Sequence, residues 1–222
     1  NMGIKTVLNN TFATPYLQLP LKYGIDFVVH SSTKYLNGHG TGISGVVIGK
    51  DNSLVNGKVK NIQKMFGACA SPFEAYLLNN GLKTLALRMD KHCENAEKLA
   101  YFLKNHEFVN HVNYLGDIDH PDHLLAKDQM KKYGGMLSFE IKGGFENSTQ
   151  FLRNIQFCTV TASLGTPDTL VSHPASMSHA KMDKMQRLEY GISDGLIRVS
   201  VGLENIEDIV ADFEQALEKL NV

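Results

Sequence analysis

The sequence predicts an α/β protein, because short apolar runs typical of strands alternate along the chain with stretches of helical periodicity. Its 222 residues, 43% of them hydrophobic, suffice to bury the core of one large or two modest domains. Residues up to about 70 are richer in glycine and loop signals than the remainder. We therefore predict a domain boundary within a long helix near residue 85, which divides the chain into 1–85 and 86–222.

Seven apolar runs, each bounded by glycine or polar residues, predict strands. Those after residue 85 alternate with helical stretches of their own. We therefore expect the second domain to be a compact unit with a small, mainly antiparallel sheet covered by helices. The predicted strands are 6–8, 27–29, 45–48, 111–115, 136–141, 158–162 and 196–201.

The longest helical pattern begins near Ser71, places Pro72 in its first turn, and continues to about residue 106, with Gly81 marking a bend or break. Later periodic stretches predict shorter helices. The last of these has acidic residues early, a lysine late and an apolar i, i+3, i+4 stripe, as a helix docked on a core should. The later helices are predicted at 121–132, 146–155, 180–190 and 205–220.

Charge and cysteine content argue against several functional classes. The net charge is −1 and no basic stripe is visible, so we expect no nucleic-acid partner. No apolar run approaches the roughly 20 residues of a membrane span, and we find no signal peptide, so we also expect no membrane partner. Three scattered cysteines, Cys69, Cys93 and Cys158, predict buried free thiols in a reducing compartment, which favours the cytoplasm.

The histidines and the glycine-rich stretch "NGHGTGISG" do not indicate sites of their own. Nine histidines, including His30, His39, His173 and His179, lack paired-ligand spacing, so we predict no metal site. The glycine-rich stretch does not open a helix after a phosphate fingerprint, so it indicates a loop with close backbone approach rather than a nucleotide site.

One lysine attracts attention because of its neighbours. Lys34 lies in "HSSTKYLNG", directly after the apolar run 27–29. An amine desolvated near apolar strands becomes available as a nucleophile toward carbonyls, which is Schiff-base chemistry. The hydroxyls of Ser31 and Thr33 are able to hydrogen-bond a phosphate. Together they suit a phosphorylated aldehyde such as pyridoxal 5'-phosphate (PLP), although a lysine between hydroxyl residues is more often a solvated loop residue.

Longer stretches carry a resemblance that decides between these interpretations. The stretch "NNTFATPYLQLPLKYGIDFVVHSSTKYLNGHGTGISGVVIG" resembles the signature region of the Cys/Met-metabolism (transsulfuration) family of fold-type I PLP-dependent enzymes. The resemblance continues through "SPFEAYLLNNGLKTLALRMDKHCENA", "GGMLSFEIKGG", "SLGTPDTLVSHPASMSHA" and "GISDGLIRVSVGLENIEDIVADFEQAL". It covers nearly the whole chain. It implies the carboxy-terminal part of a fold-type I transferase, with a partial large cofactor domain followed by a small α/β domain.

The resemblance assigns roles to particular residues. It makes Lys34 the lysine that binds PLP covalently and moves the substrate α-proton. It places Ser31 and Thr33 on the phosphate, and Arg198 on the substrate α-carboxylate, where a guanidinium ending an apolar strand suits a bidentate partner. Ser163 falls beside the lysine and the substrate carboxylate.

One position departs from the family pattern. The family has Asp-Asn-Thr where this chain has Asn9, Asn10 and Thr11, and that aspartate keeps the pyridine nitrogen of PLP protonated. The resemblance therefore makes Asn9 and Thr11 cofactor-binding residues. A neutral amide favours the pyridinium less than a carboxylate does, so we expect a weaker electron sink and lower activity.

Length is the second departure. Family members are about twice as long as this chain, and the resemblance leaves part of the phosphate cradle and the residue that stacks on the cofactor outside it. We expect a homo-oligomer or a complementing amino-terminal half as partner, because strands before residue 70 lack sheet neighbours.

The wording of the motifs is closest to that of methionine γ-lyases, which implies α,γ-elimination on a small sulfur-containing amino acid. Cystathionine lyases and synthase and O-acetylhomoserine sulfhydrylase remain alternatives, since residues that set substrate choice lie partly outside this chain. A truncated, non-catalytic assembly partner is the alternative of another class.

Overall fold

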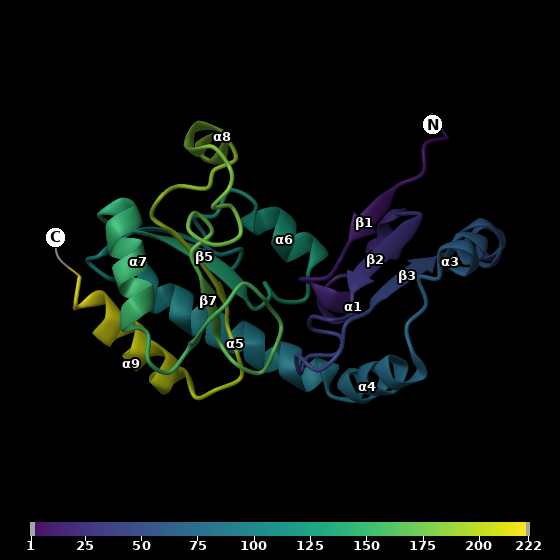
Figure 1. The fold of residues 1–222 in the computed structure, drawn as a ribbon, viewed down its shortest axis with the longest axis horizontal. Helices are drawn as coiled ribbons and strands as arrows, with labels where there is room; N and C mark the ends of the chain where they lie inside the picture. Colours follow the sequence, from purple (N-terminus) through teal and green to yellow (C-terminus); the bar gives the residue numbers. More distant parts are fainter. Residues whose placement is uncertain (1–2, 221–222) are drawn as a thin grey trace.

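The computed structural model describes residues 3–220, which form two lobes (Figure 1). The amino-terminal lobe, residues 3–83, contains a three-stranded sheet. The carboxy-terminal lobe, residues 85–220, contains a five-stranded sheet in the order β4 (Val109–Asn113), β5 (Met136–Ile141), β8 (Leu196–Ser200), β7 (Leu170–Ser172) and β6 (Thr159–Val160). Helices accompany both sheets, which confirms the predicted α/β class.

In the amino-terminal lobe, β1 (Val7–Asn9) runs parallel to β2 (Phe27–Ser31), and β2 runs antiparallel to β3 (Gly45–Gly49). All three were predicted within two residues. The connection from β1 to β2 holds the short helices α1 (Thr14–Leu17) and η1 (Pro20–Tyr23), which the sequence analysis missed. Four-residue helices are too short to show a periodic apolar stripe.

A helical arm follows β3 and was also missed. It comprises α2 (Asn52–Leu54), η2 (Val55–Val59) and α3 (Lys60–Phe66), and none of its residues is buried. Its start is fixed locally, because the Asp51 carboxylate accepts hydrogen bonds from the backbone N–H groups of Ser53 and Leu54. A helix without a buried face lacks the hydrophobic pattern on which sequence prediction depends.

The predicted long helix is two helices, α4 (Pro72–Lys83) and α5 (Leu85–Lys104). Ser71 caps α4 by accepting a hydrogen bond from the Glu74 N–H at 3.1 Å, and Pro72 occupies the first turn as predicted. The predicted break at Gly81 is wrong, since the helices meet at Thr84. The division of the chain into domains near residue 85 stays a prediction.

The carboxy-terminal lobe carries the mainly antiparallel sheet that the sequence predicted, with one parallel pair, β6 with β7. The prediction of β5 was correct to the residue, whereas the strand predicted at 158–162 is only two residues long and β7 was missed. The strands are β4 (Val109–Asn113), β5 (Met136–Ile141), β6 (Thr159–Val160), β7 (Leu170–Ser172) and β8 (Leu196–Ser200).

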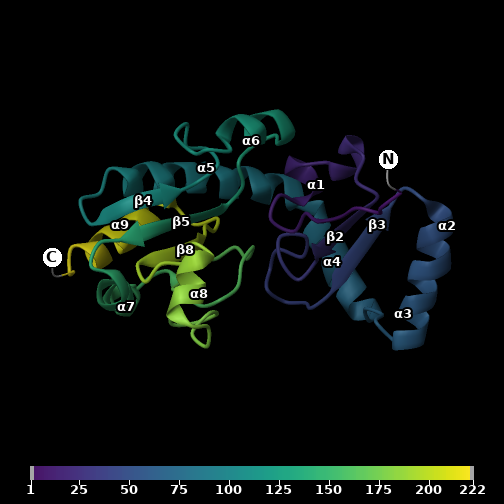
Figure 2. The ribbon, with the colours of Figure 1, turned by 90° about the horizontal axis from the view of Figure 1, so that it is seen from above.

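Helices α5, α7 (Gly144–Asn154) and α9 (Ile206–Leu217) pack together on one face of this sheet (Figure 2). The side chains of β5 alternate, so Leu137, Phe139 and Ile141 are buried beneath the helices. Phe139 meets Phe151 of α7 at 5.8 Å and Phe213 of α9 at 6.1 Å between ring centroids. The remaining helices of the lobe are α6 (His123–Gln129) and α8 (Lys184–Glu189).

The cysteines agree with the prediction in part. Cys93 and Cys158 are buried free thiols, and burial raises the pKa of Cys93 to about 11. Cys69 is exposed, contrary to the prediction, because it lies in the link between α3 and α4, where every residue is exposed. Within residues 3–220, no helix is long and apolar enough to cross a membrane.

Candidate active site

Lys34 lies in a tight turn that follows β2. The Lys34 N–H donates to the Ser31 carbonyl oxygen at 3.2 Å, and the Gly38 N–H donates to the Lys34 carbonyl oxygen at 2.7 Å. The Asn37 N–H closes the turn by donating to the Ser32 carbonyl oxygen at 3.0 Å. These three bonds join residues 31–38 to one another, so the turn that presents the lysine has a defined local conformation.

The Lys34 amine reaches from this turn to the carboxy-terminal lobe. Its Nζ donates to Ser163 Oγ at 3.0 Å, although the two residues are 129 positions apart in sequence. Ser163 lies in the loop between β6 and β7. The structure thus brings together two residues that the sequence analysis selected from distant motifs, at the point where the two lobes meet.

Three further selected residues form one chain of hydrogen bonds. The Ser31 N–H donates to Thr11 Oγ1 at 2.8 Å, and Thr11 Oγ1 donates to Asn9 Oδ1 at 2.6 Å. Asn9 Oδ1 also accepts from the Thr11 N–H at 3.1 Å, which fixes the amide orientation because a backbone N–H only donates. The Asn9 NH₂ group donates to no residue within 3–220, so it remains as a free donor.

The two hydroxyls assigned to phosphate differ. Ser31 Oγ bonds to no other described residue and is free to donate. Thr33 Oγ1 donates to the Ser44 carbonyl oxygen at 3.3 Å and accepts from the Ser44 N–H at 3.0 Å. A hydroxyl has one hydrogen, so Thr33 must release the Ser44 carbonyl before it donates to a phosphate oxygen.

Arg198 lies on β8, on the sheet face opposite the helices, and it is half-buried. Burial lowers the pKa of its guanidinium, and no carboxylate of residues 3–220 pairs with it. Its guanidinium carbon lies 5.8 Å from the centroid of the Phe12 ring, a contact that the sequence analysis missed. Both residues line an apolar cavity of about 340 Å³, together with Pro174 and Ile192. An unpaired guanidinium at such a cavity suits a carboxylate ligand.

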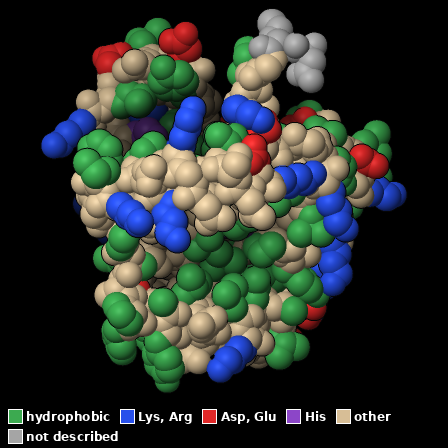
Figure 3. Space-filling model, turned by 90° about the vertical axis from the view of Figure 1, so that its right-hand side faces the viewer, with side chains coloured by type: hydrophobic (Ala, Val, Ile, Leu, Met, Phe, Trp, Pro, Cys, Tyr) green, Lys and Arg blue, Asp and Glu red, His purple; other side chains and the backbone are tan. Residues whose placement is uncertain are grey.

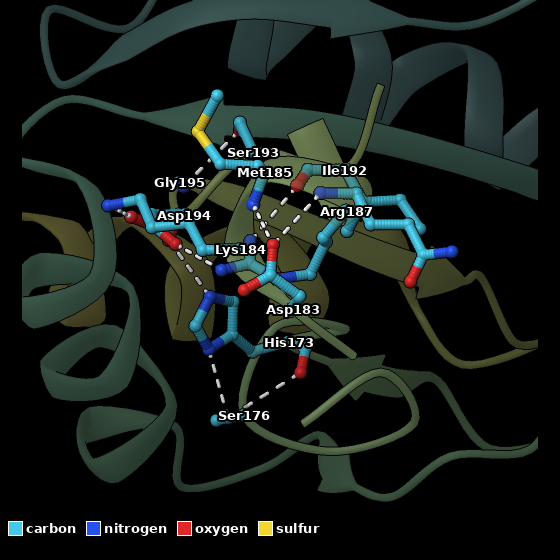
Figure 4. Close-up of polar contacts among 11 residues, drawn as sticks. His173, Ser176, Asp183, Lys184, Met185, Arg187, Ile192, Ser193, Asp194 and Gly195 are labelled. Atoms are coloured by element: carbon cyan, nitrogen blue, oxygen red, sulfur yellow. Dashed lines mark hydrogen bonds and ion pairs between the residues drawn. The ribbon is translucent and has the colours of Figure 1, made fainter. Parts of the chain in front are cut away.

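The loop that carries α8 is braced by a polar cluster (Figure 4). His173 Nε2 donates to the Asp194 carbonyl oxygen at 2.9 Å, and its Nδ1 accepts from Ser176 Oγ at 2.9 Å. The Asp194 carboxylate pairs with Lys184 at 2.5 Å and Arg187 at 2.6 Å, and these cations hold the pKa of Asp194 below its usual value. The cluster fixes one wall of the cavity beside Arg198.

The residues that are present fit one side of PLP. Lys34 supplies a primary amine, Ser31 supplies a free hydroxyl, and Asn9 supplies a free amide donor. Among residues 3–220, no group of three or more His, Cys, Asp or Glu side chains could hold a metal ion. The amine suits an aldehyde, and the hydroxyl and amide donors suit an oxyanion.

Comparison with protein families places this arrangement in context. Residues 1–218 match the model described as "Cys/Met metabolism PLP-dependent enzyme". The chain belongs to this family. Dependence on PLP is a property of the Cys/Met metabolism family, so the cofactor inferred from Lys34 and its neighbours is the family's cofactor.

Curated members of the Cys/Met metabolism family are similar over nearly the whole chain. L-methionine gamma-lyase of Fusobacterium nucleatum subsp. nucleatum is 49% identical over 220 residues, which cover 99% of this chain and 56% of that protein. Cystathionine beta-lyase of Coxiella burnetii is 46% identical over 215 residues, which cover 97% and 56%. The chain thus spans about half the length of the curated relatives it matches.

Solved structures of this family share the fold. Cystathionine gamma-lyase from Lactobacillus plantarum complexed with L-serine matches with a TM-score of 0.92 and 42% identity over 97% of this chain and 56% of that one. Cystathionine gamma synthase from Xanthomonas oryzae pv. oryzae matches with a TM-score of 0.93, 42% identity and the same shares. The two lobes therefore correspond to part of a fold-type I PLP-dependent enzyme.

Proposed function

We propose that this chain is the lysine-bearing, carboxy-terminal part of a PLP-dependent carbon–sulfur lyase that performs α,γ-elimination on a sulfur-containing amino acid, as in methionine γ-lyase. The observation that carries the proposal is the contact of Lys34 Nζ with Ser163 Oγ across the meeting point of the lobes. A lysine amine held by a hydroxyl in a partly enclosed site is suited to carbonyl chemistry. The 49% identity to an L-methionine gamma-lyase favours that branch of the family.

Lys34 has two tasks in this proposal. Its amine binds the cofactor, and when substrate takes its place the free amine accepts the α-proton and returns it later in the reaction. Ser163 Oγ, 3.0 Å from Nζ, accepts a hydrogen bond from the amine and so orients it. PLP supplies, when bound, the electron sink that makes the α-proton acidic.

Arg198 positions the substrate. Its guanidinium has no carboxylate partner among residues 3–220, and it lies at an apolar cavity beside Phe12. A bidentate bond to the α-carboxylate would satisfy the half-buried cation and set the orientation of the amino acid. The Phe12 ring covers one side of the guanidinium and limits the water that competes for it.

Ser31 and Thr33 hold the phosphate of PLP from one side, and Thr11 orders this region through Ser31 and Asn9. The free NH₂ group of Asn9 is a donor, and a donor cannot stabilise a protonated ring nitrogen as a carboxylate does. Asn9 therefore weakens the electron sink in this chain.

The site needs a partner to become complete. Because phosphate contacts are charge-assisted, each one missing costs about 1.5–3 kcal/mol, so the loss of two or three weakens binding at least about a hundredfold. We propose that a complementing amino-terminal polypeptide or a homo-oligomer supplies the rest, in the cytoplasm. The exposed apolar side chains of the amino-terminal lobe support this proposal.

Two alternatives are distinguished by experiment. Within the family, the chain could instead belong to a cystathionine lyase or synthase or to an O-acetylhomoserine sulfhydrylase, and 46% identity to a cystathionine beta-lyase keeps this open. A non-catalytic assembly partner is the alternative of another class. The presence of Asn9 where the family has an aspartate favours this alternative.

The test measures the release of 2-oxo acid and thiol from methionine and from cystathionine with PLP present. The chain is assayed alone and mixed with a polypeptide carrying the part of the Fusobacterium nucleatum relative that it does not match. We expect negligible turnover alone, recovery in the mixture, a further increase with Asn9→Asp, and loss with Lys34→Ala. The preferred substrate decides between the family branches.

Two outcomes would contradict the proposal. Turnover by the chain alone at ordinary enzyme rates, abolished by Lys34→Ala, would refute the incomplete site while supporting the lysine. A mixture that assembles, retains PLP and yet turns over no substrate, even with Asn9→Asp, would leave the assembly partner as the function.

A further inference from the structure

Arg88 of α5 is a buried cation with an unusual set of partners. Only 5% of its surface is exposed, and burial lowers the pKa of its guanidinium. No carboxylate of residues 3–220 pairs with it. A buried guanidinium requires compensating hydrogen bonds, so its partners show what it does in the fold.

The Arg88 side chain bonds both to the turn that presents Lys34 and to the junction of α4 and α5. Nη1 donates to the Tyr35 carbonyl oxygen at 2.8 Å, directly after the lysine. Nη2 donates to the Gly81 carbonyl oxygen at 2.6 Å, and Nε donates to Thr84 Oγ1 at 3.0 Å, where α4 meets α5. The planar guanidinium therefore ties the lysine turn to the junction of two helices.

Two glycines permit this close packing. Gly38, at φ +69°, ends the lysine turn, and a Cβ there would lie 1.9 Å from Arg88 Nη1. Gly81 lies inside α4, and a Cβ there would lie 2.1 Å from the Asn37 carbonyl oxygen. The turn is thus held between the guanidinium and a helix surface with no room for even one added methyl group.

We propose that Arg88 is a positioning residue for Lys34. It acts through the Tyr35 carbonyl, which it fixes relative to α4 and α5, so that the Lys34 side chain leaves the turn in the direction of Ser163. A misplacement of about 1 Å costs on the order of a hundredfold in rate when a reacting group must be aligned. The inference deepens the proposed function and depends on it for the role of Lys34.

The test uses the chain itself with PLP as probe. The lysine amine and the aldehyde condense with loss of water, and cyanoborohydride then reduces the C=N bond to a stable secondary amine. Mass spectrometry of peptides gives the labelling rate at Lys34 relative to the exposed Lys64. Hydrogen exchange at the amides of Asn37 and Gly38 reports the order of the turn independently of PLP.

Arg88→Met replaces the guanidinium by an apolar side chain, so the Tyr35 carbonyl loses its donor and the Gly81 carbonyl keeps only its bonds from Thr84. We expect it to lower the Lys34 to Lys64 labelling ratio at least tenfold and to speed exchange at Asn37 and Gly38. Arg88→Lys, which retains a donor, should give a labelling ratio and an exchange rate between those of Arg88→Met and the unaltered chain. Gly38→Ala displaces the guanidinium without removing its charge and also strains the turn at φ +69°, so it should lower the labelling ratio at least as far as Arg88→Met, which keeps the test valid if that variant does not fold.

The matched control is Asp212→Asn. Asp212 is also 5% exposed and accepts hydrogen bonds from the backbone N–H groups of Gln156, Phe157 and Cys158, within the carboxy-terminal lobe. It should lower the unfolding temperature while leaving the labelling ratio and the exchange at 37–38 unchanged. All variants are compared at a temperature at which each is folded.

Each result decides something. The inference is wrong if Arg88→Met and Gly38→Ala leave the labelling ratio and the exchange at residues 37–38 within twofold of the unaltered chain. It is also wrong if Asp212→Asn changes these two readouts as much as the Arg88 variants do, because Arg88 would then be structural only. If Lys34 of the unaltered chain is labelled no faster than Lys64, the proposed function fails. In that case, faster hydrogen exchange at residues 37–38 in the Arg88 variants would still show that Arg88 orders the turn.

Discussion

The two lobes differ in how completely they bury their apolar side chains. The carboxy-terminal lobe has one continuous core of aliphatic and aromatic residues beneath α5, α7 and α9. The amino-terminal lobe has few buried hydrophobic residues, and its arm and α4 expose large ones, including Met65 (83%), Phe66 (80%) and Phe73 (67%). Figure 3 looks onto this lobe, and hydrophobic side chains are prominent on its surface.

This difference supports the proposal that a partner covers part of the amino-terminal lobe. Monomers rarely expose large contiguous apolar surfaces, and within residues 3–220 no strand lies beside the outer edge of β1. The lysine turn belongs to the amino-terminal lobe, whereas Ser163 and Arg198 belong to the other. The candidate site therefore combines residues of both lobes.

The largest expected contrast is in resistance to a protease. Limited digestion should cut first in the arm and the link to α4, within residues 50–71, where almost every side chain is exposed. A fragment that begins after the arm and contains residues 86–220 should persist, as gel electrophoresis and mass spectrometry would show. Cleavage in the carboxy-terminal lobe before the arm, with no stable fragment from it, would refute the proposed domain division.

Matched phenylalanines sharpen the comparison. Phe213→Ala removes a fully buried ring that touches Phe139 and Phe151, so it should lower the free energy of unfolding by about 3–5 kcal/mol. Phe73→Ala on the exposed face of α4 should change it by less than about 0.5 kcal/mol. Urea titration followed by circular dichroism measures both, and similar losses would show that the lobes are equally well packed.

His92 tests the contact between the lobes by its pH dependence. It is fully buried on α5 and donates from Nδ1 to the Val201 carbonyl oxygen at 2.7 Å. The centroid of its ring lies 5.1 Å from the centroid of the Tyr35 ring. Burial lowers its pKa to about 4 in the folded chain, below the usual 6.5 of the unfolded chain. The unfolded chain therefore binds the proton first as the pH falls.

Stability contributed by neutral His92 is fully present above pH 6.5 and is lost as the pH falls toward 4, in total about 3 kcal/mol. His92→Asn retains a donor for Val201 and does not titrate in this range. The variant should lose less stability than the unaltered chain between pH 7 and pH 4 in urea titrations. Equal losses in both proteins would show that His92 is not buried as described.

The sequence predicted best where burial imposes a pattern. The β5 strand was correct to the residue because its buried and half-buried side chains alternate, and α9 was found from its apolar stripe. The arm was missed because it buries nothing here. Gly81 was misinterpreted as a break because the sequence does not show that the Asn37 carbonyl packs against it.

The same limit applies to the candidate site. Lys34, Ser163 and Arg198 were selected from local motifs and family resemblance, but only the fold shows that the first two touch. The commitment of the Thr33 hydroxyl to Ser44, the contact of Phe12 with Arg198, and the role of Arg88 depend on contacts between distant segments. A single arginine in a helical pattern looks like a surface residue until its partners are known.

The most direct test of the central claim is the retention of PLP after dialysis. The central claim is that Lys34 lies in a site that this chain forms only in part. Visible absorbance of lysine-bound PLP is measured after dialysis for the chain alone, for the chain with the complementing polypeptide, and for both with Lys34→Ala. We expect a band only in the complemented, unaltered chain. Stoichiometric PLP retained by the chain alone, or a band that survives Lys34→Ala, would contradict the account.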